Sequence, residues 1–153
     1  MEFDMRIQKA IFTILSLAAV LTLTIGTAGV TPARAAGVVV NSNVDTVAND
    51  GFCTLREAIT AANTNTASGA AAGECAAGFG ADTITFDGDY TITLVGSQLP
   101  AVTSQITING NGATNTIVQA SACDPTVGFG GGCDINYRVF EVTSTGSLTL
   151  NDM

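Results

Sequence analysis

The chain has 153 residues, no histidine, and only five lysine or arginine residues. Without histidine, a serine or cysteine nucleophile lacks its usual general base. Thirteen acidic residues give the chain a net charge of −8. Such a surface repels phosphate and anionic lipid headgroups, because it has few basic groups to neutralise them. We therefore expect no nucleic-acid partner.

The first 35 residues have the layout of a secretory signal peptide. Arg6 and Lys9 precede an apolar run over residues 10–25, and the small-residue sequence Ala33-Arg34-Ala35 follows. We expect cleavage after Ala35. The alternative is an uncleaved membrane anchor, since residues 10–30 are nearly long enough to span a bilayer. Cleavage is favoured because Thr, Ser and Gly dilute the run, so we expect a secreted or cell-surface location without membrane insertion.

All four cysteines follow the leader, at Cys53, Cys75, Cys123 and Cys133. An even number in an exported chain favours two disulfides over free thiols. Three pairings are possible, and the local ones, Cys53 with Cys75 and Cys123 with Cys133, are the simplest. Zinc is the rival interpretation, but the chain has no Cys-x-x-Cys sequence and no histidine. We expect neither a metal nor a cofactor.

Residues 55–63 form the one convincing helix of the sequence. Thr54 and Glu57 fit a capping box, in which each side chain accepts a hydrogen bond from the backbone amide of the other residue. Apolar residues then recur at helical spacing, so the helix should pack against the rest of the domain. Asn63 is suited to end it in a left-handed conformation. The expected cap residues are Thr54, Leu55, Arg56, Glu57, Ala58 and Ile59.

From residue 82 onward the pattern changes to the two-residue period of β-strands. Short segments that alternate polar β-branched and apolar residues are separated by glycine and asparagine turns. A further apolar segment, residues 38–41, precedes the helix. The six strands expected after the helix are 83–86, 91–94, 105–108, 116–118, 138–142 and 147–150.

The spacing of these strands favours a coil over hairpins. Ile84 precedes Ile106 by 22 residues and Leu94 precedes Ile117 by 23, so alternate strands recur with nearly one period. A period in the twenties is typical of a solenoid of parallel strands. A glycine-rich loop over residues 120–137, closed by an expected disulfide between two of the cysteines, interrupts this spacing. We expect an all-β solenoid whose first turn is covered by the helix.

A family resemblance rests on residues 53–59, Cys-Thr-Leu-Arg-Glu-Ala-Ile, followed by Ala-Ala-Asn, Cys75 and residues 82–86. This pattern resembles the CSLREA domain at the start of secreted bacterial right-handed parallel β-helix proteins. Thr54 stands where the family motif has Ser, and both residues cap helices well. The resemblance implies a cap over residues 36–81 and the first rungs of a right-handed parallel β-helix over residues 82–153. Since the last rung breaks off, we expect an N-terminal fragment.

The remaining charged residues do not suggest a catalytic site. Asp82, Asp87 and Asp89 form the densest acidic cluster, and Asp87 and Asp89 are the best calcium candidates. A turn between strands explains the Asp-Gly-Asp sequence more simply. Arg138 is best explained as a solvated charge at a strand end. Arg56 does not face the adjacent Glu57 on a helix, so we expect it to pair elsewhere in the cap.

We therefore expect a noncatalytic capping segment of a secreted or surface-exposed β-helix protein. Its expected role is structural, adhesive or carbohydrate-binding, with extracellular carbohydrate or cell-surface components as partners. The alternative is the front end of a β-helix polysaccharide lyase or glycoside hydrolase whose catalytic residues lie beyond residue 153.

Overall fold

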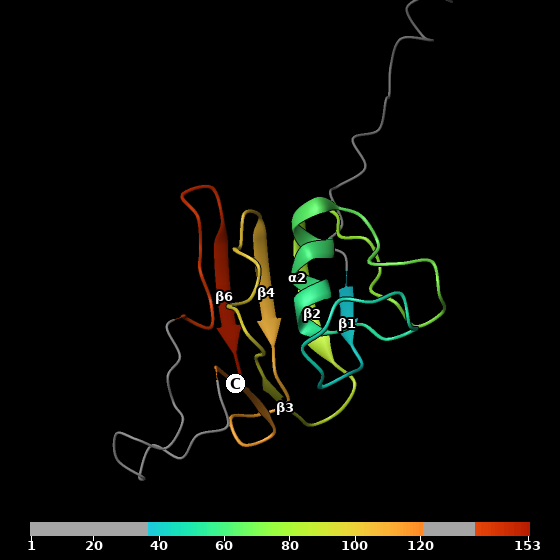
Figure 1. The fold of residues 1–153 in the computed structure, drawn as a ribbon. Helices are drawn as coiled ribbons and strands as arrows, with labels where there is room; N and C mark the ends of the chain where they lie inside the picture. The colour runs from blue at the N-terminus through green and yellow to red at the C-terminus, as the bar shows by residue number, and fades with distance from the viewer. Residues whose placement is uncertain (1–36, 121–136) are drawn as a thin grey trace, which may run out of the picture. The chain divides into compact units, whose positions relative to one another are not determined.

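The computed structural model describes residues 37–120 and 137–153 (Figure 1). The leader, Cys123 and Cys133 lie outside the described residues. The elements are β1 (Gly37–Val40), α2 (Leu55–Thr64), β2 (Ala81–Phe86), β3 (Tyr90–Thr93), β4 (Gln105–Asn109), β5 (Thr116–Gln119) and β6 (Ser147–Asn151).

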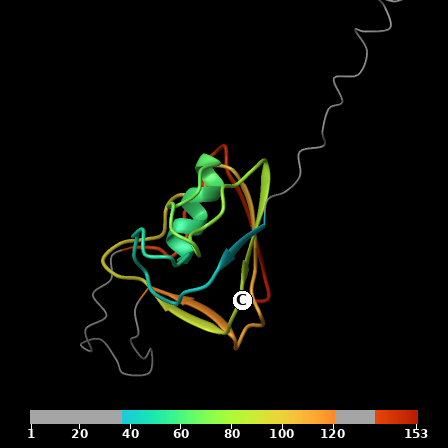
Figure 2. The same ribbon diagram turned by 90° about the vertical axis from the view of Figure 1, so that its right-hand side faces the viewer.

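The strands of the described residues form two parallel sheets. One sheet has four strands in the order β1-β2-β4-β6, and β3 pairs with β5 in the other. Figure 2 shows α2 on one side of the four-stranded sheet. The opposite side of this sheet carries no described helix.

The predicted all-β, right-handed parallel β-helix is wrong. The described residues form a small mixed α/β fold with two parallel sheets and one short helix, and no solenoid is found among them. Regular apolar spacing indicates parallel neighbours, but it does not distinguish a coil from a sheet whose inner face is covered by a helix. Here α2 contributes six buried residues and is part of the core itself.

The register of the sheet also differs from the predicted period. Ile84 pairs with Ile108 rather than with Ile106, which lies beside Asp82. The next strand, β6, then places Leu150 beside Ile108. Equivalent apolar positions thus follow one another across the sheet at unequal sequence intervals.

One of the six predicted strands is absent from the described structure. Residues 138–142 make only an isolated parallel bridge, between Val102 and Val142. The amides of Leu99 and Val102 donate to the carbonyls of Val139 and Glu141, at 3.2 and 2.8 Å. Pro100 lies between these two donors and has no amide hydrogen, so a regular ladder cannot continue there.

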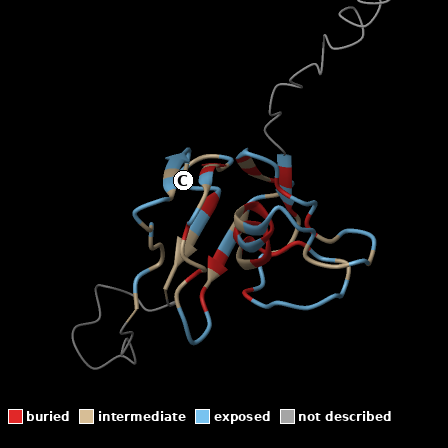
Figure 3. Cartoon of the chain, turned by 90° about the horizontal axis from the view of Figure 1, so that it is seen from above, coloured by how far each residue is buried: buried red, intermediate tan, exposed pale blue. Residues whose placement is uncertain are grey.

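The core lies between α2 and the inner face of the four-stranded sheet. Every second residue of β1, β2 and β4 is buried, as the alternating colours along the strands show (Figure 3). Leu55 and Ile59 of the helix are fully buried in the same cluster as Val38, Ile84 and Ile108. The apolar side chains that recur at helical spacing in α2 and at every second residue in the strands therefore form one apolar layer.

Helix α2 begins at the expected capping box and ends later than expected. The Thr54 side chain accepts from the Glu57 amide, and the Glu57 side chain accepts from the Thr54 amide. The left-handed C-terminal residue is Asn65, with φ of 53°, and not Asn63. Asparagine tolerates this conformation better than most residues, so either position satisfied the sequence pattern.

Replacing Ile59 with Asp tests the helix–sheet contact. Ile59 has no exposed surface, so the variant buries a carboxylate without a partner, and we expect the free energy of unfolding to fall by about 3–5 kcal/mol. Thr60→Asp, at the exposed neighbouring position, is the control and should change it far less. The measurement is denaturant unfolding followed by circular dichroism. Equal unfolding midpoints for the two variants would contradict the packing described here.

Candidate functional site

The carboxylate of Glu57 is fully engaged at the start of α2. Its Oε2 accepts from the Thr54 amide at 3.0 Å, and its Oε1 accepts from the Ala48 amide at 2.8 Å. Glu57 is 2% exposed. The side chain therefore holds the preceding loop to the helix N-terminus, where a negative charge also interacts favourably with the helix dipole.

Arg56 forms a bidentate ion pair with Asp45. The sequence had not indicated Asp45 as its partner. Nε donates to Oδ1 and Nη2 to Oδ2, both at 2.8 Å, and the Asp45 side chain is 1% exposed. The planar guanidinium matches a carboxylate in this geometry better than an ammonium group does.

The same ion pair binds the loop after β3. Arg56 donates to the carbonyls of Ser97 and Gln98, at 3.0 and 2.8 Å. The Val95 amide donates to Asp45 Oδ2 at 2.7 Å. Arg56 and Asp45 thus fix the loop before α2, the helix and residues 95–98 together.

Asn63 binds the backbone beside β4 instead of ending the helix. Its Oδ1 accepts from the amides of Thr103 and Ser104, at 2.9 and 3.2 Å, and its Nδ2 donates to the Ala101 carbonyl at 2.8 Å. An amide side chain can donate and accept in this way because it carries both functions.

A disulfide joins Cys53, directly before the helix cap, to Cys75. This local pair is one of the two expected from the sequence, and both of its residues are buried. Beside it, the Ser68 hydroxyl and the Gly51 amide donate to Glu74 at 2.6 and 2.9 Å. These two hydrogen bonds, that of Ser68 first, hold the pKa of Glu74 below its usual value.

The predicted acidic cluster is divided between two environments. Asp82 points to the inner face of β2 and is 1% exposed, with Oδ1 accepting from the Phe79 amide at 2.7 Å. Asp87 and Asp89 are exposed in the turn before β3. Tyr90 donates to Asp87 at 2.6 Å, and this bond, followed by partial burial and the negative charge, raises the pKa of Tyr90.

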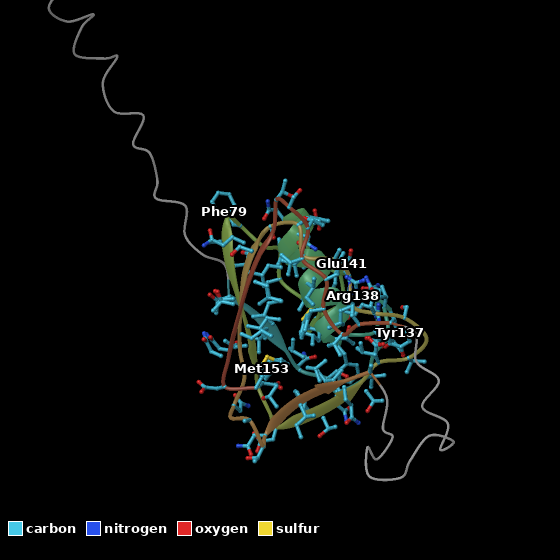
Figure 4. All side chains as sticks on the ribbon, turned by 90° about the vertical axis from the view of Figure 1, so that its left-hand side faces the viewer. Phe79, Tyr137, Arg138, Glu141 and Met153 are labelled. Carbon is cyan, nitrogen blue, oxygen red and sulfur yellow. A yellow bond between two sulfur atoms is a disulfide. The ribbon has the colours of Figure 1, made fainter. Side chains whose placement is uncertain are left out.

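The described ranges 37–120 and 137–153 contain no group of three or more His, Cys, Asp or Glu residues placed to hold a metal ion. Arg138 is exposed and Glu141 is half-buried, and Figure 4 labels both. Glu141 accepts a hydrogen bond from Gln98. No helix in these same ranges is long and apolar enough to cross a membrane.

Comparisons with known protein families, with curated protein sequences and with solved structures find no match to this chain. The resemblance to the CSLREA domain therefore stays a prediction.

Sequence reasoning missed the structural roles of Asp45, Asn63 and Glu74. Each of these side chains binds backbone groups that are distant in sequence, such as Val95 for Asp45. Arg56 on the helix indicated that an acidic partner existed, but no local sequence pattern identified that partner as Asp45.

Replacing Arg56 with Met tests the ion pair. The buried Asp45 would lose its main partner, and two carbonyls would lose their donor, so we expect a loss of about 3 kcal/mol in unfolding free energy. Arg138→Met, which removes an exposed charge, should have little effect. Chemical denaturation of both variants is the measurement, and equal stabilities would exclude the role assigned to the pair.

Replacing Asp87 with Asn tests the raised pKa of Tyr90. The variant should lower that pKa, which ultraviolet titration of the phenol measures, whereas Asp89→Asn should not. Because the folded pKa exceeds the unfolded value of about 10, this bond stabilises the fold below pH 10 and the contribution is lost as pH rises through the folded pKa. Identical titrations for wild type and Asp87→Asn would contradict the hydrogen bond.

Proposed function

We propose that this chain is a noncatalytic structural and binding module of an exported protein, acting in adhesion or carbohydrate binding at a cell surface. The observation that carries the proposal is that three charged side chains at and near the start of α2 are bound within the domain. Arg56, Glu57 and Glu74 bind backbone groups and stabilise loops. Groups so engaged are poor candidates for moving protons on a substrate.

Two features support an exported location. The first 35 residues have the charge and hydropathy layout of a cleavable leader. The buried Cys53–Cys75 disulfide is of a kind that persists in oxidising spaces outside the cytoplasm. A covalent link beside the helix cap also suits a small domain that must remain folded without a cell's chaperones.

The chain expressed with its own leader in a bacterial host tests this function. We expect the protein outside the cytoplasm, beginning at Ala36, with Cys53 and Cys75 joined in peptide mapping without reductant. We also expect the exported protein to adsorb to purified cell-envelope material without releasing soluble sugar. Double replacement of Cys53 and Cys75 by Ala should lower stability by about 2–4 kcal/mol.

Two outcomes would contradict the proposal. One is retention in the cytoplasm with free thiols. The other is release of reducing sugars or unsaturated uronides from polysaccharides, which would identify an enzyme.

A further inference from the structure

The outer face of the four-stranded sheet is mostly polar on β2, β4 and β6, whereas β1 contributes Val39, which is 48% exposed. Parallel sheets are usually covered on both faces by apolar packing. Along β2 and β4 the side chains of the outer face alternate with the buried ones. Thr83, Thr107 and Thr149 stand beside one another on β2, β4 and β6. Neighbouring strands lie about 4.8 Å apart, so these three hydroxyls form one regular row.

Further polar residues flank this threonine row on the same face. Gln105 pairs with Ser147 on one side, and Asn109 pairs with Asn151 on the other. These flanking positions lie about 6.7 Å from the threonine row along each strand, because they are two residue positions away from it. We call these three rows the hydroxyl–amide face.

The hydroxyl–amide face carries no charged residue, although the chain has a net charge of −8. Within the described residues, Asn151 donates to Asn109 at 2.8 Å, but the hydroxyls of the threonine row have no such partner. Figure 4 shows side chains of the sheet projecting away from the helix side. The face therefore offers hydrogen-bond donors and acceptors without a charge.

An exposed aromatic ring lies at the end of the same sheet. Phe79 is 59% exposed and precedes β2 (Figure 4). An aromatic ring can stack against the apolar face of a sugar ring, while hydroxyls and amides bond to sugar hydroxyls.

We infer that the hydroxyl–amide face binds a neutral polysaccharide in an extended conformation; this inference rests on the proposed function. Hydroxyl and amide groups both donate and accept, as sugar hydroxyls do. Repulsion by the acidic chain disfavours uronate-containing and phosphate-containing polymers. A repeating polymer suits the face because equivalent side chains recur from strand to strand.

Affinity electrophoresis of the mature, oxidised protein in gels containing hydroxyethyl cellulose, galactomannan or dextran tests the inference, with polygalacturonate as the anionic comparison. We expect retardation by at least one neutral polymer and none by polygalacturonate. Joint replacement of Thr83, Thr107 and Thr149 by Val should weaken that binding by roughly tenfold. Replacement of the same three residues by Ser keeps the hydroxyls and should retain most of it.

Two controls separate binding from folding. Valine keeps the β-branched shape that strands favour, and the melting temperature of each variant is measured alongside. Thr91→Val changes an exposed threonine of β3, in the other sheet, and should leave binding unchanged. Phe79→Ala alters no strand residue and should weaken binding several-fold.

The inference is overturned if the valine variant and Phe79→Ala bind as tightly as wild type, if polygalacturonate alone retards the protein, or if the protein binds ice crystals and no polysaccharide. Adsorption to cell-envelope material that survives the threonine replacements would refute this face and leave the proposed function standing. Failure of the wild-type protein to adsorb to cell-envelope material would refute both this inference and the proposed function.

Discussion

The packing of α2 against one face of a parallel sheet is the constraint on which the rest of this structure depends. Parallel neighbours cannot be joined by tight hairpins, so each connection must cross from one end of the sheet to the other. Such connections need an apolar layer to lie on, and Leu55 and Ile59 provide it together with Val38, Ile84 and Ile108. Because one short helix covers the sheet, its angle and position must be held firmly.

Two sets of polar contacts and one disulfide supply that restraint. Arg56 and Asp45 bind the helix to residues 95–98, Asn63 binds its other end to residues 101–104, and the Cys53–Cys75 disulfide secures the loop before it. Buried ion pairs add little net stability in general, but their geometry selects one arrangement over others. We therefore interpret Arg56 and Asp45 as determinants of helix placement.

Local features of the structure could be predicted from the sequence, and features set by distant contacts could not. The capping box was predictable because Thr54 and Glu57 are three residues apart, and five of the six strands after the helix followed from alternation. The all-β solenoid was wrong because parallel spacing is compatible with more than one covering layer. The predicted strand at residues 138–142 is absent for a similar reason, since Pro100 in the neighbouring segment interrupts the ladder of hydrogen bonds between the two segments. Asp45 gave no signal, because its partners depend on the completed fold.

The two faces of the four-stranded sheet satisfy opposite requirements. On the inner face, Ile84 and Ile108 are fully buried, whereas on the outer face Thr83 and Thr107 at adjacent positions remain partly exposed. β-branched residues suit both faces, so threonine preserves strand propensity while it presents a hydroxyl to solvent. A charged residue at these positions would also have kept the face soluble. The hydroxyl-bearing and amide-bearing residues therefore keep this face solvated without adding charge to a chain whose net charge is already −8.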